Sequence, residues 1–109
     1  MTDEVSFEEW QKLDLRVGKI LKVEDIEGAD KLYKLEVDIG DEKRTLAAGL
    51  KEFYKKEELQ GKMCVVFCNL TPRTMRGVES NGMILAADEN GKPTLIAPEE
   101  EVEIGSKIR

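Results

Sequence analysis

The sequence contains no histidine, and this absence removes the side chain that most often acts as a general base near neutral pH. No nucleophile elbow, no lysine-containing phosphate loop and no recognisable pair of catalytic carboxylates is present either. No apolar run approaches the length of a bilayer span, and the first ten residues lack the basic and apolar regions of a secretory signal. These absences favour a soluble, cytoplasmic binding module that needs no cofactor and is not an enzyme.

Cysteine is scarce as well, with only Cys64 and Cys68 in the chain. Their C-x3-C spacing is used by some zinc sites, but both lie in an apolar run that predicts a strand. In an extended strand the two residues are roughly 13 Å apart, which is too far for a disulfide or a shared metal ion. We therefore expect two buried, unreactive thiols.

Basic residues are fewer than acidic ones, 17 against 23, and they are unevenly distributed. Residues 43–78 carry eight bases and three acids, whereas the flanking segments are acidic. Between Glu58 and Glu79 there are twenty residues without an acid. A local basic region can bind a polyanion even when the net charge is −6. The alternative is that folding disperses these charges over the surface.

Strands are indicated by alternating or continuous apolar residues bounded by glycine, proline or acidic turns. They are predicted over residues 13–23, 32–39, 43–48, 63–68 and 83–87. In the second strand Tyr33, Leu35, Val37 and Ile39 should face inward. In the first strand the apolar phase changes after Gly18, which predicts a β-bulge at that glycine.

Two helices are expected. Ser6 followed three residues later by Glu9 forms a capping box for a short N-terminal helix. The spacing of Leu50, Phe53 and Tyr54 predicts an amphipathic helix that runs to about residue 59. A 109-residue chain is one domain, here residues 1–109. Three strands, a helix and two strands predict an all-β fold, the five-stranded Greek-key barrel of the oligonucleotide/oligosaccharide-binding (OB) type.

The segment between the last two predicted strands is the candidate binding loop. It carries Arg73 and Arg76 together with neutral donors and two glycines that let a ligand approach the backbone. The alternative is a solvated hairpin tip. Residues 88–109 form a C-terminal extension with more strand than a minimal barrel needs, so they are either a packed tail or a contact between two copies.

Several segments resemble the tRNA-binding domain found in methionyl-tRNA synthetases and in free-standing proteins. The matching segments are DLRVG at 14–18, ADKLY at 29–33, VDIG at 37–40, RTLAAGL at 44–50, NL at 69–70 and RTMRGVESNGMILAA at 73–87. The likeness covers residues 7–109, and its last segment is the most specific. Because the chain begins with Met and ends as the family domain does, it resembles a free-standing or separately encoded β-subunit form.

The resemblance implies a non-catalytic homodimer that recognises folded tRNA by shape and raises the tRNA affinity of a methionyl-tRNA synthetase catalytic chain. Matched position by position, it implies tRNA contacts at Lys31, Arg44, Asn69, Arg73, Arg76, Ser80, Asn81 and Met83. Few aromatic residues are present. We expect Phe7, Trp10, Phe53, Tyr54 and Phe67 to lie in the core and Tyr33 to point inward, which disfavours binding by base stacking. The alternative is a chaperone similar to CsaA, whose fold and opening strand are similar.

Overall fold

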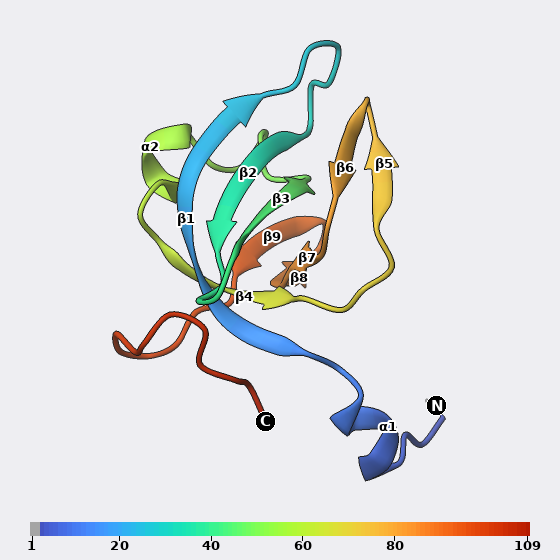
Figure 1. The fold of residues 1–109 in the computed structure, drawn as a ribbon. Coiled ribbons are helices and arrows are strands. Elements are labelled where there is room, and N and C mark those ends of the chain that lie inside the picture. Colours follow the sequence, from blue (N-terminus) through green and yellow to red (C-terminus); the bar gives the residue numbers. More distant parts are fainter. Residues whose placement is uncertain (1–2) are drawn as a thin grey trace.

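The computed structural model describes residues 3–109, in which five strands form one antiparallel sheet of order β3-β2-β1-β4-β7 (Figure 1). Two hairpins, β5-β6 and β8-β9, are attached to it. The elements are α1 (Phe7–Gln11), β1 (Leu15–Asp25), β2 (Tyr33–Asp38), β3 (Lys43–Ala48), α2 (Lys56–Leu59), β4 (Met63–Phe67), β5 (Arg73–Met75), β6 (Val78–Ser80), β7 (Met83–Ile84), β8 (Ala86–Glu89) and β9 (Lys92–Leu95). Among residues 3–109, no helix is long and apolar enough to cross a membrane.

The core lies inside the curved sheet. Tyr33, Leu35, Val37 and Ile39 are all buried, which confirms the inward face predicted for β2. β4 is buried at Cys64, Val65 and Val66, as its continuous apolar run predicts. The largest fully buried side chains are Ile20, Leu35, Ile39, Leu46, Leu59, Val37, Val66 and Cys64.

The barrel is nearly closed by hydrogen bonds between β3 and the segment that leads from β6 into β7. The Asn81 N–H donates to the Thr45 carbonyl at 2.9 Å, and the Ala47 N–H donates to Ser80 Oγ at 3.0 Å. The Ser80 hydroxyl in turn donates to the Gly82 carbonyl at 2.9 Å. Since α2 lies between the third and fourth strands of this barrel, the predicted OB fold is confirmed.

The bulge in β1 lies three residues after the predicted position. Gly18 pairs regularly with Cys64, and the register with β2 shifts between Ile20 and Lys22 instead. A Cβ at Gly18 would lie 2.8 Å from Val37 Cγ1. The glycine is therefore needed for a close approach of β1 and β2, and the prediction of a bulge there was wrong.

The helix predicted from residue 50 is much shorter than expected, because α2 contains only Lys56–Leu59. Residues 50–54 instead form a tight turn, in which the Phe53 and Tyr54 N–H groups both donate to the Leu50 carbonyl. Lys55 is extended and interrupts any continuous helix. Phe53 is 43% exposed, so its predicted core position was wrong.

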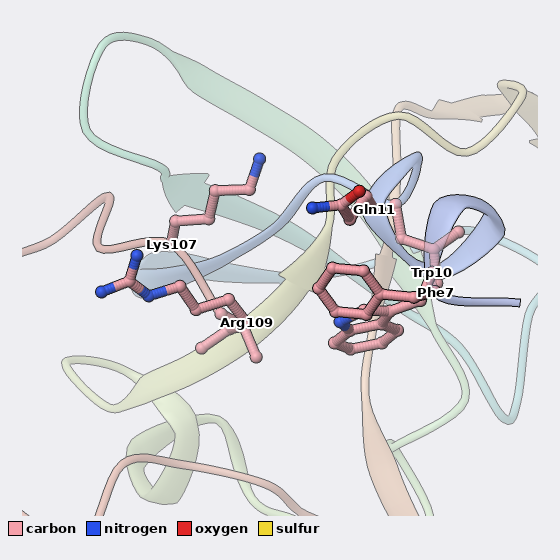
Figure 2. A pocket seen from close by; sticks show the side chains of 7 residues that line it. Phe7, Trp10, Gln11, Lys107 and Arg109 are labelled. Atoms are coloured by element: carbon pink, nitrogen blue, oxygen red, sulfur yellow. The ribbon is translucent and has the colours of Figure 1, made fainter.

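Helix α1 and the last residues of the chain lie together beside the barrel. The capping box of α1 is confirmed, since Ser6 and Glu9 exchange hydrogen bonds. Phe7, however, is 70% exposed and Trp10 is only half-buried, so neither is a core residue. They line an open pocket of about 520 Å³ together with Gln11, Leu13, Lys107, Ile108 and Arg109 (Figure 2).

The C-terminal tail is packed against β1. The Gly105 N–H donates to the Val17 carbonyl at 2.8 Å, and the Val17 N–H donates to the Ser106 carbonyl at 2.9 Å. The Ile108 N–H donates to the Leu15 carbonyl at 2.8 Å. These bonds satisfy backbone N–H and C=O groups on one edge of β1, in the part of the strand whose other edge pairs with β4. They support the packed-tail interpretation of residues 104–108.

Because Ser80 takes part in closing the barrel and is only 3% exposed, we expect its substitution to destabilise the fold. Ser80→Ala should lower the free energy of unfolding by about 1–3 kcal/mol, because it leaves the Ala47 N–H and the Gly82 carbonyl without their partner. Equilibrium denaturant unfolding measures the change. Thr74→Ala on exposed β5 is the control and should have little effect. A Ser80 variant as stable as wild type would show that this bond does not close the barrel.

Candidate nucleic-acid interface

The segment predicted as a loop is a regular hairpin, which corrects the prediction. β5 and β6 pair from Arg73 with Ser80 to Met75 with Val78. The two turn residues, Arg76 and Gly77, have φ values of 50° and 80°. Positive φ at both positions is typical of the tight turns that suit the twist of a hairpin. The strands thus hold Arg76 at a defined tip, which projects beside the β1–β2 connection (Figure 1).

Two of the predicted contacts meet between this tip and the β1–β2 connection. Lys31 and Arg76 both line a pocket of about 380 Å³, together with Gly28, Asp30 and Leu32. In the OB fold, the first connection and the one that leads to the last strand are the loops that bind oligonucleotides. The basic residues therefore lie at the end of the barrel where this fold holds nucleic acid.

A second pocket adjoins the first, and Leu32 lines both. It has a volume of about 230 Å³ and contains Arg73, Met75 and Met83 in its lining. Met83 is half-buried in β7, where it pairs with Phe67. Four of the eight predicted contacts, Lys31, Arg73, Arg76 and Met83, thus surround one continuous surface, called here the barrel mouth.

Folding disperses part of the basic region and concentrates the rest. Lys51 and Lys56 both form ion pairs with Asp25, at 3.1 and 2.7 Å. Within residues 3–109, by contrast, none of the ion pairs involves the cations of the barrel mouth, Lys31, Arg73 and Arg76. All three side chains are exposed. The positive charge of the mouth is therefore available to a polyanion.

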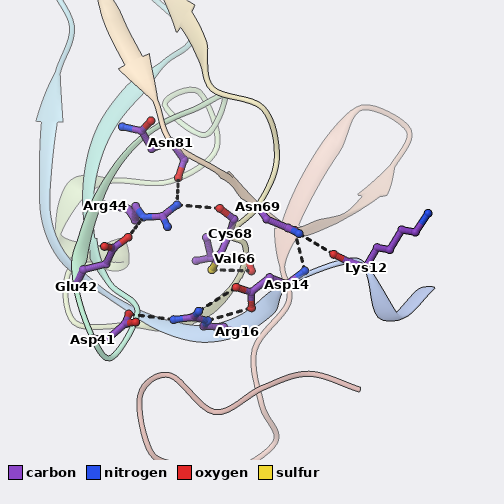
Figure 3. Close-up of polar contacts among 10 residues, drawn as sticks. All are labelled: Lys12, Asp14, Arg16, Asp41, Glu42, Arg44, Val66, Cys68, Asn69 and Asn81. Atoms are coloured by element: carbon purple, nitrogen blue, oxygen red, sulfur yellow. Dashed lines mark hydrogen bonds and ion pairs between the residues drawn. The ribbon is translucent and has the colours of Figure 1, made fainter. Parts of the chain in front are cut away.

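Arg44 points into the protein and braces the barrel (Figure 3). Its Nη1 donates to the Cys68 carbonyl at 2.8 Å and to the Asn81 carbonyl at 3.0 Å, and its Nε pairs with Glu42. The guanidinium therefore ties β3 to both ends of the β4–β7 connection, which carries the β5-β6 hairpin.

Three further predicted contacts are also engaged within the protein. Asn69 accepts from the Asp14 N–H at 2.8 Å and donates to the Lys12 carbonyl at 2.6 Å (Figure 3). Ser80 is buried, and both backbone polar groups of Asn81 bond to β3. These residues hold the connections in place around the mouth.

Arg16 is a structural residue whose role sequence reasoning missed. It donates to both carboxylate oxygens of Asp14, at 3.0 and 2.9 Å, and to Asp41 at 3.0 Å. These hydrogen bonds lower the pKa of Asp14, despite some desolvation by burial. The signal was the D-x-R spacing in the opening strand, which places the two side chains on one face. The cluster joins the start of β1 to the β2–β3 turn (Figure 3).

The two cysteines are buried and free, as predicted. Burial raises the pKa of Cys64 to about 12 and also raises that of Cys68. A thiol that stays protonated at neutral pH is a poor nucleophile and a poor metal ligand. In the part of the chain that the structure describes, no group of three or more side chains is arranged to hold a metal ion.

Comparisons with known proteins show which family the chain is similar to. A family model described as "Putative tRNA binding domain" matches residues 15–107. Methionine–tRNA ligase of Pyrococcus furiosus is 55% identical over 105 residues, which are 96% of this chain and 14% of that ligase. The chain thus spans a small part of the curated relatives it matches.

Two solved structures are similar over nearly the whole chain. A methionyl-tRNA synthetase-related protein of Pyrococcus horikoshii has a TM-score of 0.93 and 38% identity, covering 99% of this chain and all of that one (100%). The chaperone CsaA of Bacillus anthracis has a TM-score of 0.89 and 28% identity, covering 98% of this chain and 100% of that one. With the family model matching most of its length, this chain belongs to the tRNA-binding domain family.

Proposed function

We propose that this domain binds folded tRNA at the barrel mouth through the RNA backbone, and that it carries out no chemistry of its own. The observation that carries the proposal is the set of three exposed cations, Lys31, Arg73 and Arg76, around two joined pockets. Cations without a carboxylate partner can release counterions from phosphates, which supplies most of the affinity for nucleic acid.

The mouth is better suited to a folded RNA than to an extended single strand. Sequence-tolerant single-strand sites stack successive bases on aromatic side chains. Among residues 3–109, the lining of the two mouth pockets includes no aromatic residue. The exposed rings, Phe7 and Phe53, are elsewhere. Backbone and shape recognition therefore supports tRNA as the ligand.

Within this proposal the predicted contacts have two roles. Lys31, Arg73, Arg76 and Met83 touch the RNA. Arg44, Asn69, Ser80 and Asn81 hold the loops in the shape that the RNA meets.

The partner we propose is a methionyl-tRNA synthetase catalytic chain in the cytoplasm. The 55% identity to a segment of such a ligase supports it. A domain that holds tRNA beside a catalytic chain raises the effective concentration of tRNA at that chain, whether it is a β-subunit or a free-standing accessory protein.

We also propose that the domain works as a homodimer whose contact includes the C-terminal extension, residues 88–109. The pocket lined by Phe7, Trp10 and Ile108 supports this, since it exposes apolar surface where the two chain ends meet. α1 lies at the end of the molecule away from the β5-β6 tip (Figure 1). A dimer formed there leaves both barrel mouths accessible.

The likeness to CsaA favours a second candidate, a chaperone that binds unfolded protein segments. The apolar lining of the Arg73 pocket is compatible with it. We place it second because the S-x-GM segment, Ser80 to Met83, belongs to the tRNA-binding pattern and because exposed cations suit phosphate better than apolar peptide.

Removing a mouth arginine tests the tRNA site. Arg73→Ala and Arg76→Ala should each weaken tRNA binding and reduce the slope of log K against log salt by about one unit, because each removes one phosphate contact. Binding titrations at several salt concentrations measure both quantities. Unstructured RNA and single-stranded DNA of equal length show whether shape adds to charge.

Lys55→Ala is the matched control for charge. Lys55 is exposed at the N-cap of α2. In Figure 1, α2 lies on the side of the barrel away from the β5-β6 hairpin. Its loss changes the net charge equally and should leave the slope nearly unchanged. Equal slopes for all three variants would remove Arg73 and Arg76 from the interface.

Phe7→Asp tests the dimer. A carboxylate in the apolar contact would have to be buried by the second copy, so the variant should be monomeric in light scattering after size-exclusion chromatography. Phe53→Asp is the control, because Phe53 is also exposed but does not line the pocket that contains Phe7. A monomeric wild-type protein, or a Phe7→Asp variant that stays dimeric, would contradict this contact.

A further inference from the structure

The geometry of the Arg73 pocket points to a more specific ligand, and we propose that it receives one unstacked base of the bound RNA. This inference rests on the proposed function. It adds that the domain reads the position of a base that protrudes from the helices of the folded RNA, besides the RNA backbone.

The lining of the pocket is mostly apolar and combines small residues with two flexible methionines. Several of its residues contribute little side-chain volume: Ala47 and Ala48 of β3, Gly49 directly after β3, and Ala86 of β8. Met75 and Met83 also line the pocket, and thioethers make favourable contacts with aromatic rings. A flat, uncharged ring system with polar edges fits such a pocket, as bases extruded from a stack do in other proteins.

Gly49 shows that space beside the pocket is open. A Cβ at this position would have no heavy atom within 4 Å, and the residue does not have a positive φ. The backbone there therefore does not require glycine, and a side chain would project into free volume. Because Gly49 lines the pocket and its Cβ would meet no atom, a side chain can be added at this position without a clash inside the protein.

The charges around the pocket favour a nucleotide over a purely apolar group. Arg73 is in its lining, and in the part of the chain that the structure describes no acidic residue lines it. Leu32 joins it to the neighbouring pocket, whose lining has two cations, Lys31 and Arg76, and one carboxylate, Asp30. A base in the apolar pocket would therefore have cations near the phosphates on either side of it.

The size of the pocket limits the ligand to one base. Its volume of about 230 Å³ is below the usual range for a site that encloses a drug-sized molecule. Moving a base out of its stack costs the least free energy when that base is already unpaired. The ligand is therefore a loop or bulge base of a folded RNA, and a fully paired stem should lack it.

Filling the pocket tests the inference on the protein side. Ala86→Phe and Gly49→Leu should each weaken tRNA binding about tenfold without changing the salt slope, because no charge is lost. Ala87→Phe is the matched control, since Ala87 is the next residue of β8, is exposed, and faces away from the pocket. If all three variants bind tRNA as tightly as wild type, the pocket holds no base.

Changing the RNA tests the same inference on the ligand. Three stems are compared: one with a single bulged 2-aminopurine, one with an abasic bulge and one fully paired. The bulged base should bind about tenfold more tightly than the other two, and its fluorescence should change in wild type but not in Ala86→Phe. Equal affinity for the bulged base and the abasic bulge would overturn the inference, because bending alone would then explain binding.

The outcomes separate this inference from the proposed function. If wild type binds no tRNA, the proposed function itself is wrong. If tRNA binds with the predicted salt slopes but the filled variants are unaffected, only the base pocket is wrong. A third outcome is that an apolar peptide binds wild type but not Ala86→Phe, while the two proteins have the same affinity for tRNA. The occupant of the pocket is then a peptide side chain, and the inference is overturned.

Discussion

The structure depends on the bonds by which β3 holds the segment between β6 and β7. Ser80 Oγ, the Asn81 backbone and the Arg44 guanidinium link this segment to β3, and they nearly close a five-stranded sheet into a barrel. The β5-β6 hairpin is an insertion in the β4–β7 connection, so its direction follows from how that connection is held. Buried polar groups must keep their partners, which makes this closure both costly to break and geometrically specific.

Folding also leaves an acidic protein with a local cationic surface. Several bases of the middle segment pair with acids from other parts of the chain, such as Lys51 and Lys56 with Asp25. Within residues 3–109, the cations of the barrel mouth form no such pair, and they line the two joined pockets where the connections of the fold meet. Local potential decides docking, while the acidic remainder disfavours binding elsewhere on the surface.

Much of the fold could be predicted because it depends on short-range patterns. The alternation in β2, the capping box at Ser6 and the buried run of β4 are all decided by neighbouring residues, and the structure confirms each. The candidate site was predicted less completely. Sequence likeness grouped eight residues as RNA contacts, but it could not distinguish side chains that face the mouth from those, such as Ser80, that bond inside the protein.

By itself, the sequence determined the order of the main barrel strands, the basic character of its middle segment and the burial of its two cysteines in an apolar strand. Only the tertiary structure decided where the β1 bulge lies, how short α2 is and which cations remain free. Those features depend on contacts between distant residues, such as Gly18 against Val37 and Arg44 against the Cys68 carbonyl. Because the partners are far apart in the chain, local periodicity carries no information about them.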